Sequence, residues 1–106
     1  DSAGHQYGWM GEAYLQACRQ SLDEIQKLTE SFMDEYTIII TADHGGHDRT
    51  HGSLEKEDML IPLICIGPDF CPGSRFEQAG ICDIAPTITR LSGASPAREW
   101  EGNSLI

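Results

Sequence analysis

Apolar residues recur along the first third of the chain at the spacing of an amphipathic helix. Between about residues 12 and 34 they fall three or four positions apart, with polar and charged residues between them. These apolar positions are Tyr14, Cys18, Leu22, Ile25, Leu28 and Phe32. Residues 84–92 show a similar pattern, with Asp83 as a suitable N-cap and Gly93 as a suitable residue after the last turn. We therefore predict two helices and expect both to pack on a sheet.

Two short apolar runs have the character of buried β-strands. Residues 37–41 are rich in β-branched side chains, and residues 61–66 form a second run of mostly apolar residues. Uninterrupted apolar character is typical of strands that are covered on both faces, as in parallel sheets. The polar segment 43–58 between them has no helical pattern of normal length, and loops of that length usually carry function. The pattern predicts an α/β fold with two parallel, buried strands and an extended tail over residues 94–106.

Composition indicates a globular chain with an acidic surface. Its 106 residues, 40% hydrophobic and 23% charged, suit one small domain. The 17 acidic residues outnumber the 7 basic ones and give a formal net charge of −10, which argues against a nucleic-acid-binding surface. Two bound divalent ions would still make a site locally positive, so an anionic substrate is compatible with this charge. No apolar run approaches the roughly 20 residues of a membrane span, and nothing resembles a secretory signal.

The four cysteines are expected to be free. None of them forms a C-x-x-C pair, so a thiolate zinc knuckle is not expected. Cys18 and Cys65 lie in apolar stretches and are interpreted as buried small hydrophobes. Two disulfides are the alternative, and the lack of any sign of secretion disfavours them.

The candidate chemistry is concentrated where the first predicted strand ends. Residues 37–51 read TIIITADHGGHDRTH, so that Asp43 and His44 follow the strand directly and two more histidines come within seven residues. The candidate metal ligands of the chain are Asp1, His5, Asp43, His44, His47 and His51. Carboxylates and imidazoles held at the end of a rigid strand suit a hard or borderline divalent ion. We interpret the segment as half of a metal-dependent hydrolytic site.

Two other interpretations of these residues are open. A single Asp or His in a loop is usually a solvated or capping side chain. The grouping of all four histidines in two loops, two of them beside glycines that permit tight turns, favours a site instead. A helical site that uses three histidines of one face is disfavoured, because Gly45, Gly46 and Gly52 interrupt the segment.

Five short blocks of the sequence together resemble the alkaline phosphatase superfamily. They read D-x-x-G-H at 1–5, T-A-D-H-G-G at 41–46, H-G at 51–52, I-P and G-P within 61–68, and D-I-A-P-T at 83–87. The blocks occur in order and cover nearly the whole chain, and the best match is to the type I phosphodiesterase/nucleotide pyrophosphatase-like branch. The resemblance implies that the chain is the C-terminal part of a three-layer α/β/α sandwich.

The resemblance also implies a role for most of the candidate residues. The implied metal ligands are Asp1, His5 and His51 for one ion, and Asp43 and His44 for a second ion. His47 matches no ligand of the family. Zinc is the metal that suits these donors best, with manganese as the alternative. The implied reaction is two-metal phosphoryl transfer through a covalent phospho-enzyme. Its Thr or Ser nucleophile and a further Asp ligand belong to the N-terminal part of such an enzyme and are not in this chain.

We therefore expect residues 1–106 to be a fragment of a two-metal hydrolase that acts on a small phosphoric ester. No catalytic residue is assigned within the chain, and the fragment alone is expected to be inactive. The alternatives are a phosphomutase or sulfatase fragment of the same superfamily, and a stand-alone metal-binding module. The isolated chain is expected to self-associate, because two apolar strands have only two amphipathic helices to cover them.

Overall fold

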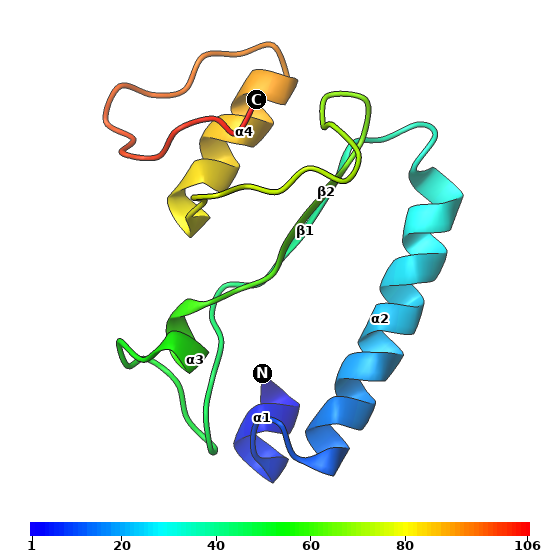
Figure 1. Ribbon diagram of the computed structural model, residues 1–106, viewed down its shortest axis with the longest axis vertical. Helices are drawn as coiled ribbons and strands as arrows, with labels where there is room; N and C mark the ends of the chain where they lie inside the picture. The colour runs from blue at the N-terminus through cyan, green and yellow to red at the C-terminus, as the bar shows by residue number, and fades with distance from the viewer. The chain divides into compact units, whose positions relative to one another are not determined.

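The computed structural model describes all residues, 1–106, and the chain divides into two compact units, 1–65 and 66–106. The elements of the first unit are α1 (Ser2–Tyr7), α2 (Glu12–Phe32), β1 (Ile38–Thr41), α3 (Lys56–Met59) and most of β2 (Leu63–Ile66). The second unit contains the 3-10 turn η1 (Ile81–Asp83) and α4 (Ile84–Leu91) (Figure 1).

The main helices and both strands lie where the apolar pattern predicts them, which confirms the α/β class. The segment expected as a loop at residues 1–5 is instead the start of α1. Asp1 takes the N-cap position, and its carbonyl accepts the N–H of His5 at 3.1 Å. Asp1 and His5 are therefore one helical turn apart on the same face of α1.

β1 and β2 pair in a two-stranded sheet, but they run in opposite directions. Figure 1 shows the chain passing down β1 and returning up β2. Beyond the strands, the N–H of Gly45 bonds to Asp58 O at 2.8 Å and that of Gly46 to Glu57 O at 2.7 Å, so the partner's number falls as the chain advances. The prediction of parallel strands is therefore wrong. A parallel pair needs a crossover connection, usually a helix, and the connection here contains only the four-residue α3.

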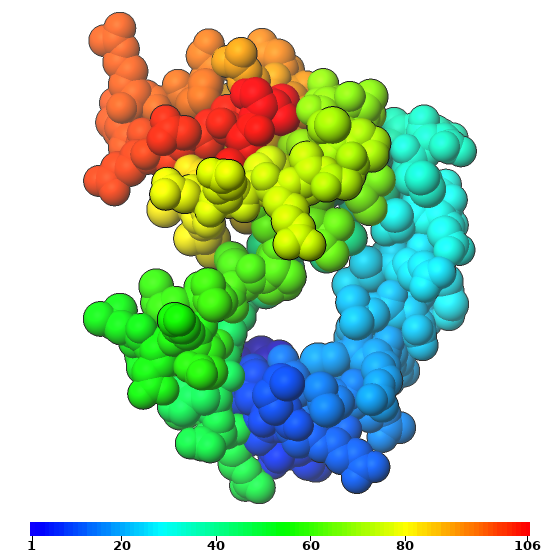
Figure 2. Space-filling model, viewed as in Figure 1, coloured from blue at the N-terminus to red at the C-terminus, as the bar shows by residue number.

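The apolar surfaces of the first unit stay largely open. Apart from Pro86 in the second unit, no apolar side chain of the chain is buried, and Ile64 of β2 is 49% exposed. The prediction of strands covered on both faces is therefore not met within this chain. α2 packs against α1, and its Leu22 and Leu28 are each 59% exposed. Figure 2 shows an opening in the molecule beside the lower part of α2, so this part of the helix is uncovered on that side.

In the second unit, two side chains fasten the C-terminal tail to the start of α4. Thr87, only 1% exposed, donates its Oγ1–H to the Asp83 carbonyl at 2.6 Å and accepts the N–H of Leu105 at 3.0 Å. The Asp83 carboxylate accepts the N–H groups of Asn103 and Gly80, both at 2.7 Å. These two hydrogen bonds lower the pKa of the Asp83 carboxyl. Asp83 is at the predicted N-cap position, but its side chain joins separate segments and makes no bond to its own helix.

The cysteines and the helices agree only in part with what the composition predicts. All four cysteines are free, as expected; Cys18 and Cys65 are half-buried, and Cys71 and Cys82 are exposed. Cys18 and Cys65 are therefore less buried than predicted, although partial burial still raises the pKa of the Cys65 thiol. None of the helices combines the length and the apolar character that crossing a membrane requires.

Candidate metal centre

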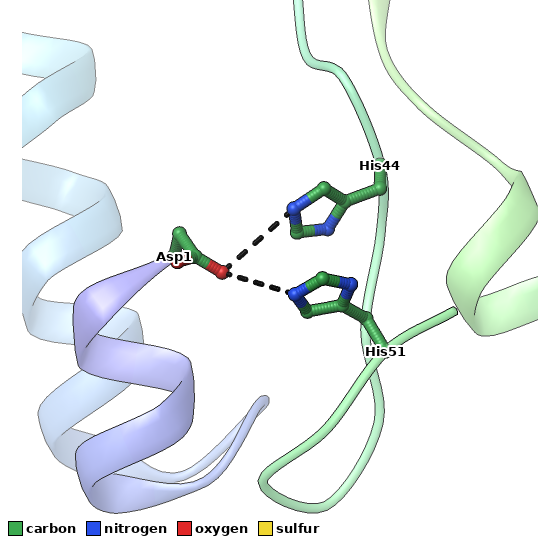
Figure 3. A group of neighbouring side chains, drawn as sticks. All are labelled: Asp1, His44 and His51. Atoms are coloured by element: carbon green, nitrogen blue, oxygen red, sulfur yellow. Dashed lines mark ion pairs between the residues drawn. The ribbon is translucent and has the colours of Figure 1, made fainter. Parts of the chain in front are cut away.

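Three side chains from two distant parts of the sequence converge beside α1 (Figure 3). Asp1 comes from the start of α1, and His44 and His51 come from the loop that follows β1. Oδ1 of Asp1 lies 3.8 Å from Nε2 of His44 and 3.6 Å from Nε2 of His51. One donor atom from each residue lies within 4.8 Å of the other two. Donor atoms around one tetrahedral zinc ion are about 3.3 Å apart, so this cluster has nearly the size that a divalent ion requires.

His5 extends the cluster along the same face of α1. Its Nε2 lies 3.2 Å from Oδ1 of Asp1, as expected for residues four positions apart in a helix. Its ring centroid lies 5.1 Å from that of His51. The three residues that the family resemblance implies for one ion therefore lie together.

Asp43 lies at the edge of this cluster. Its Oδ1 accepts the N–H of His44 at 3.1 Å and its Oδ2 lies 3.7 Å from His44 Nε2, but the side chain is 85% exposed. The His44 ring stacks on that of His51 with centroids 3.7 Å apart, so His44 is shared between the two predicted groups of ligands. The structure brings all five predicted ligands into one continuous cluster, and their division between two ions stays a prediction.

Backbone carbonyl groups orient two of the imidazole rings. Nδ1 of His5 lies 2.9 Å from Arg49 O, and Nδ1 of His44 lies 2.7 Å from Gly45 O. A carbonyl oxygen only accepts, so Nδ1 carries the proton in both neutral rings and the Nε2 lone pair is free. In both rings Nε2 is the atom that faces Asp1. Metal-bound histidines commonly show this arrangement, and the residues therefore fit a divalent ion.

Trp9 forms an aromatic wall beside the cluster, which the sequence analysis missed. Its ring lies edge-on to His5 at 5.1 Å and to His51 at 5.9 Å between centroids. It also covers two glycines: a Cβ at Gly4 would lie 2.5 Å from its Cδ2, and a Cβ at Gly46 would collide with the ring as well. The contact depends on the turn after α1, so no spacing in the sequence marks it.

His47, which matches no ligand of the family, pairs with a buried carboxylate. Its Nδ1 donates to Oδ1 of Asp58 at 2.8 Å, and Asp58 is only 4% exposed. The hydrogen bond to Asp58 raises the pKa of His47. The hydrogen bond from His47, with a further one from Ser53, lowers the pKa of Asp58 to about 2. Asp58 cannot be singled out from the sequence, because one carboxylate in a polar segment carries no periodic signal.

Comparison with known proteins gives a consistent set of matches. Residues 1–96 match the family model described as the metalloenzyme superfamily. The chain is 34% identical over 96 residues to a phosphopentomutase of Edwardsiella ictaluri, an alignment that covers 90% of this chain and 23% of that protein. It is 31% identical over 113 residues to a 2,3-bisphosphoglycerate-independent phosphoglycerate mutase of Hahella chejuensis, covering 100% of this chain and 21% of that protein. The chain thus spans less than a quarter of the length of these curated relatives. No solved structure matches.

These relatives correct the predicted reaction. They are mutases, and not phosphodiesterases or nucleotide pyrophosphatases, so that branch of the superfamily is not supported. Phosphomutases are isomerases, and the prediction of a hydrolase acting on phosphoric esters is therefore wrong. The phosphomutase alternative fits the relatives better. The family match implies divalent metal ions without showing which metal they are.

Proposed function

Because this chain belongs to the metalloenzyme superfamily, whose members are alkaline phosphatase-like, we propose that it supplies part of the divalent-metal centre of a phosphomutase. In this proposal it is one segment of a longer catalytic domain, which provides the nucleophile and the remaining ligands. The ligands proposed in this chain are Asp1, His5, Asp43, His44 and His51. The observation that carries the proposal is the convergence of Asp1, His44 and His51 within 4.8 Å.

The side chains of the cluster suit this task by charge and by orientation. A divalent ion bound there would stabilise the charge on phosphate oxygens during phosphoryl transfer. Asp1 contributes a carboxylate, and His5 and His44 present free Nε2 atoms because their Nδ1–H groups are held by carbonyls. This mixture of oxygen and nitrogen donors favours zinc, with manganese as the alternative.

A mutase and a hydrolase that share such a centre differ in where the phosphoryl group ends. In a mutase the P–O bond to one substrate oxygen breaks and a P–O bond to another oxygen forms, with no net consumption of water. In a hydrolase water takes the phosphoryl group, and inorganic phosphate is released. The proposed substrate class is a small phosphate ester with a further hydroxyl group. The named relatives support this class, since phosphopentoses and phosphoglycerates both have that composition.

The proposal is tested on the full-length protein that carries this chain, loaded with zinc or with manganese. Phosphorus NMR should show a phosphopentose or a phosphoglycerate converting between positional isomers without accumulation of inorganic phosphate. Release of inorganic phosphate alone would contradict the proposal. Metal analysis should show that His44→Ala and His51→Ala lower the bound metal. Asp23→Asn, on the exposed surface of α2, serves as the control that leaves it unchanged.

A further inference from the structure

We propose that Asp58 is a positioning residue of this metal centre, which holds the loop carrying His44 and His51 so that both imidazoles face Asp1. The inference rests on the proposed function, because it concerns the same centre. Asp58 is attached to this loop at three points, one through its backbone carbonyl and two through its carboxylate.

The backbone of α3 fixes the chain immediately after His44. The Asp58 carbonyl accepts the N–H of Gly45 at 2.8 Å, and the Glu57 carbonyl accepts that of Gly46 at 2.7 Å. The approach is close, since a Cβ at Gly45 would collide with the carbonyl oxygen of Glu57. α3 therefore lies directly against the two residues that follow His44.

The carboxylate of Asp58 ties down both flanks of His51. Its Oδ1 accepts the Nδ1–H of His47 at 2.8 Å, and its Oδ2 accepts the N–H of Ser53 at 2.7 Å. Within this segment His47 and Thr50 exchange backbone hydrogen bonds of 3.1 and 2.9 Å, which close a tight turn. His51 is thus carried by a short segment whose two ends bind the same side chain.

Burial gives these hydrogen bonds their effect. Asp58 is 4% exposed, and both of its carboxylate oxygens are used. A side chain without acceptor atoms would leave the His47 and the Ser53 donors unpaired away from water. Opening of the loop would relieve that penalty and would move His51 away from Asp1. Loss of a group that orients metal ligands typically lowers metal affinity by about 10–100-fold.

Zinc titration of the full-length protein tests the inference, with zinc alone as the probe. Asp58→Ala, which removes both acceptor oxygens, should weaken zinc binding by about 10–100-fold. Asp23→Asn, which removes the same charge from the surface of α2, should not change it. If the wild type binds no zinc, the proposed function fails and this inference with it. If the wild type and Asp58→Ala bind zinc equally tightly, only this inference fails.

Two variants of His47 separate positioning from direct ligation and from a folding defect at Asp58. In His47→Asn the side-chain amide N–H takes the place of Nδ1–H and keeps the bond to Asp58, while Nε2 is lost. This variant should keep the wild-type zinc affinity, whereas His47→Ala should lose about tenfold or more. Equal losses in both variants would show that His47 acts through Nε2 and would overturn the inference. The pair decides the question even if Asp58→Ala does not fold, because Asp58 stays in place.

Discussion

Replacing Gly4 with alanine is predicted to damage the metal centre, although alanine favours helices. Gly4 lies inside α1, where the exchange would by itself stabilise the helix by about 0.5–1 kcal/mol. The new Cβ would lie only 2.5 Å from Cδ2 and Cε2 of Trp9. Carbon atoms in contact normally stay about 3.5–4.0 Å apart, so the indole ring or α1 must shift by about 1 Å.

That shift acts directly on two proposed ligands. Trp9 lies against the rings of His5 and His51, and Gly4 precedes His5 in α1. Overpacking of this kind typically costs about 1–3 kcal/mol, which exceeds the gain in helix propensity. The net loss is about 1 kcal/mol, and if it falls on the metal-bound state, zinc affinity drops about fivefold.

Zinc titration of the full-length protein measures this effect, and a double-mutant cycle assigns its cause. Trp9→Ala removes the collision, so adding Gly4→Ala to that background should be neutral or slightly stabilising. Gly80→Ala is the matched control, because its Cβ would meet no atom closer than 3.7 Å and its φ is −126°. Wild-type zinc affinity in Gly4→Ala, or an equal loss in the Trp9→Ala background, would refute the reasoning.

Three further predictions concern stability and association. The His47–Asp58 pair should stabilise the fold fully between pH 3.8 and 6.5, which are the pKa values of the unpaired Asp and His side chains. Its contribution to the free energy of unfolding is lost as the pH rises through the raised pKa of His47. It is also lost as the pH falls towards about 2, the lowered pKa of Asp58. Urea unfolding of the wild type and Asp58→Asn should show the largest difference in that window, and a difference that is constant with pH would contradict it. Thr87→Val should lower the free energy of unfolding by about 1–3 kcal/mol and speed hydrogen exchange at Leu105, because that N–H loses its buried acceptor; unchanged exchange there would count against it. The isolated 106-residue chain should self-associate through its open apolar strands, and sedimentation that shows only monomer at micromolar concentration would exclude this.

The elements that the sequence predicts well are those that a short window determines. The periodic apolar residues of α2 predict a helix, and the β-branched run of β1 predicts a strand. The observed ends of both elements therefore lie within two residues of the predicted ends. The sequence does not predict α1, because six residues are too few to show a repeating apolar pattern. The direction of β2 is not a local property at all, since it depends on how the connection from β1 travels. Burial is not a local property either, because it depends on which other elements cover a strand. The apolar residues of β1 indicate only that burial of this strand would be favourable.

The residues of the candidate site also differ in whether a short stretch of sequence can identify them. Asp43 and His44 could be found because a carboxylate and an imidazole at the end of a strand form a compact signal. Trp9 and Asp58 could not, because each acts through contacts with residues that no spacing rule connects to it. The sequence thus shows the donor atoms of the cluster, while the groups that orient those donors appear only in three dimensions.

The hydrogen bond between His5 and Arg49 joins residues 44 positions apart, and this separation affects the order in which the molecule assembles. Closing a loop of that length costs about 3 kcal/mol of chain entropy, whereas a helix such as α2 forms locally within about a microsecond. The site is therefore completed late in folding, after the elements that carry it. An ion bound by ligands at both ends of this segment would hold the two ends together, much as a covalent cross-link does. Removal of the ion would then lower the free energy of unfolding of this part of the chain as well as empty the site.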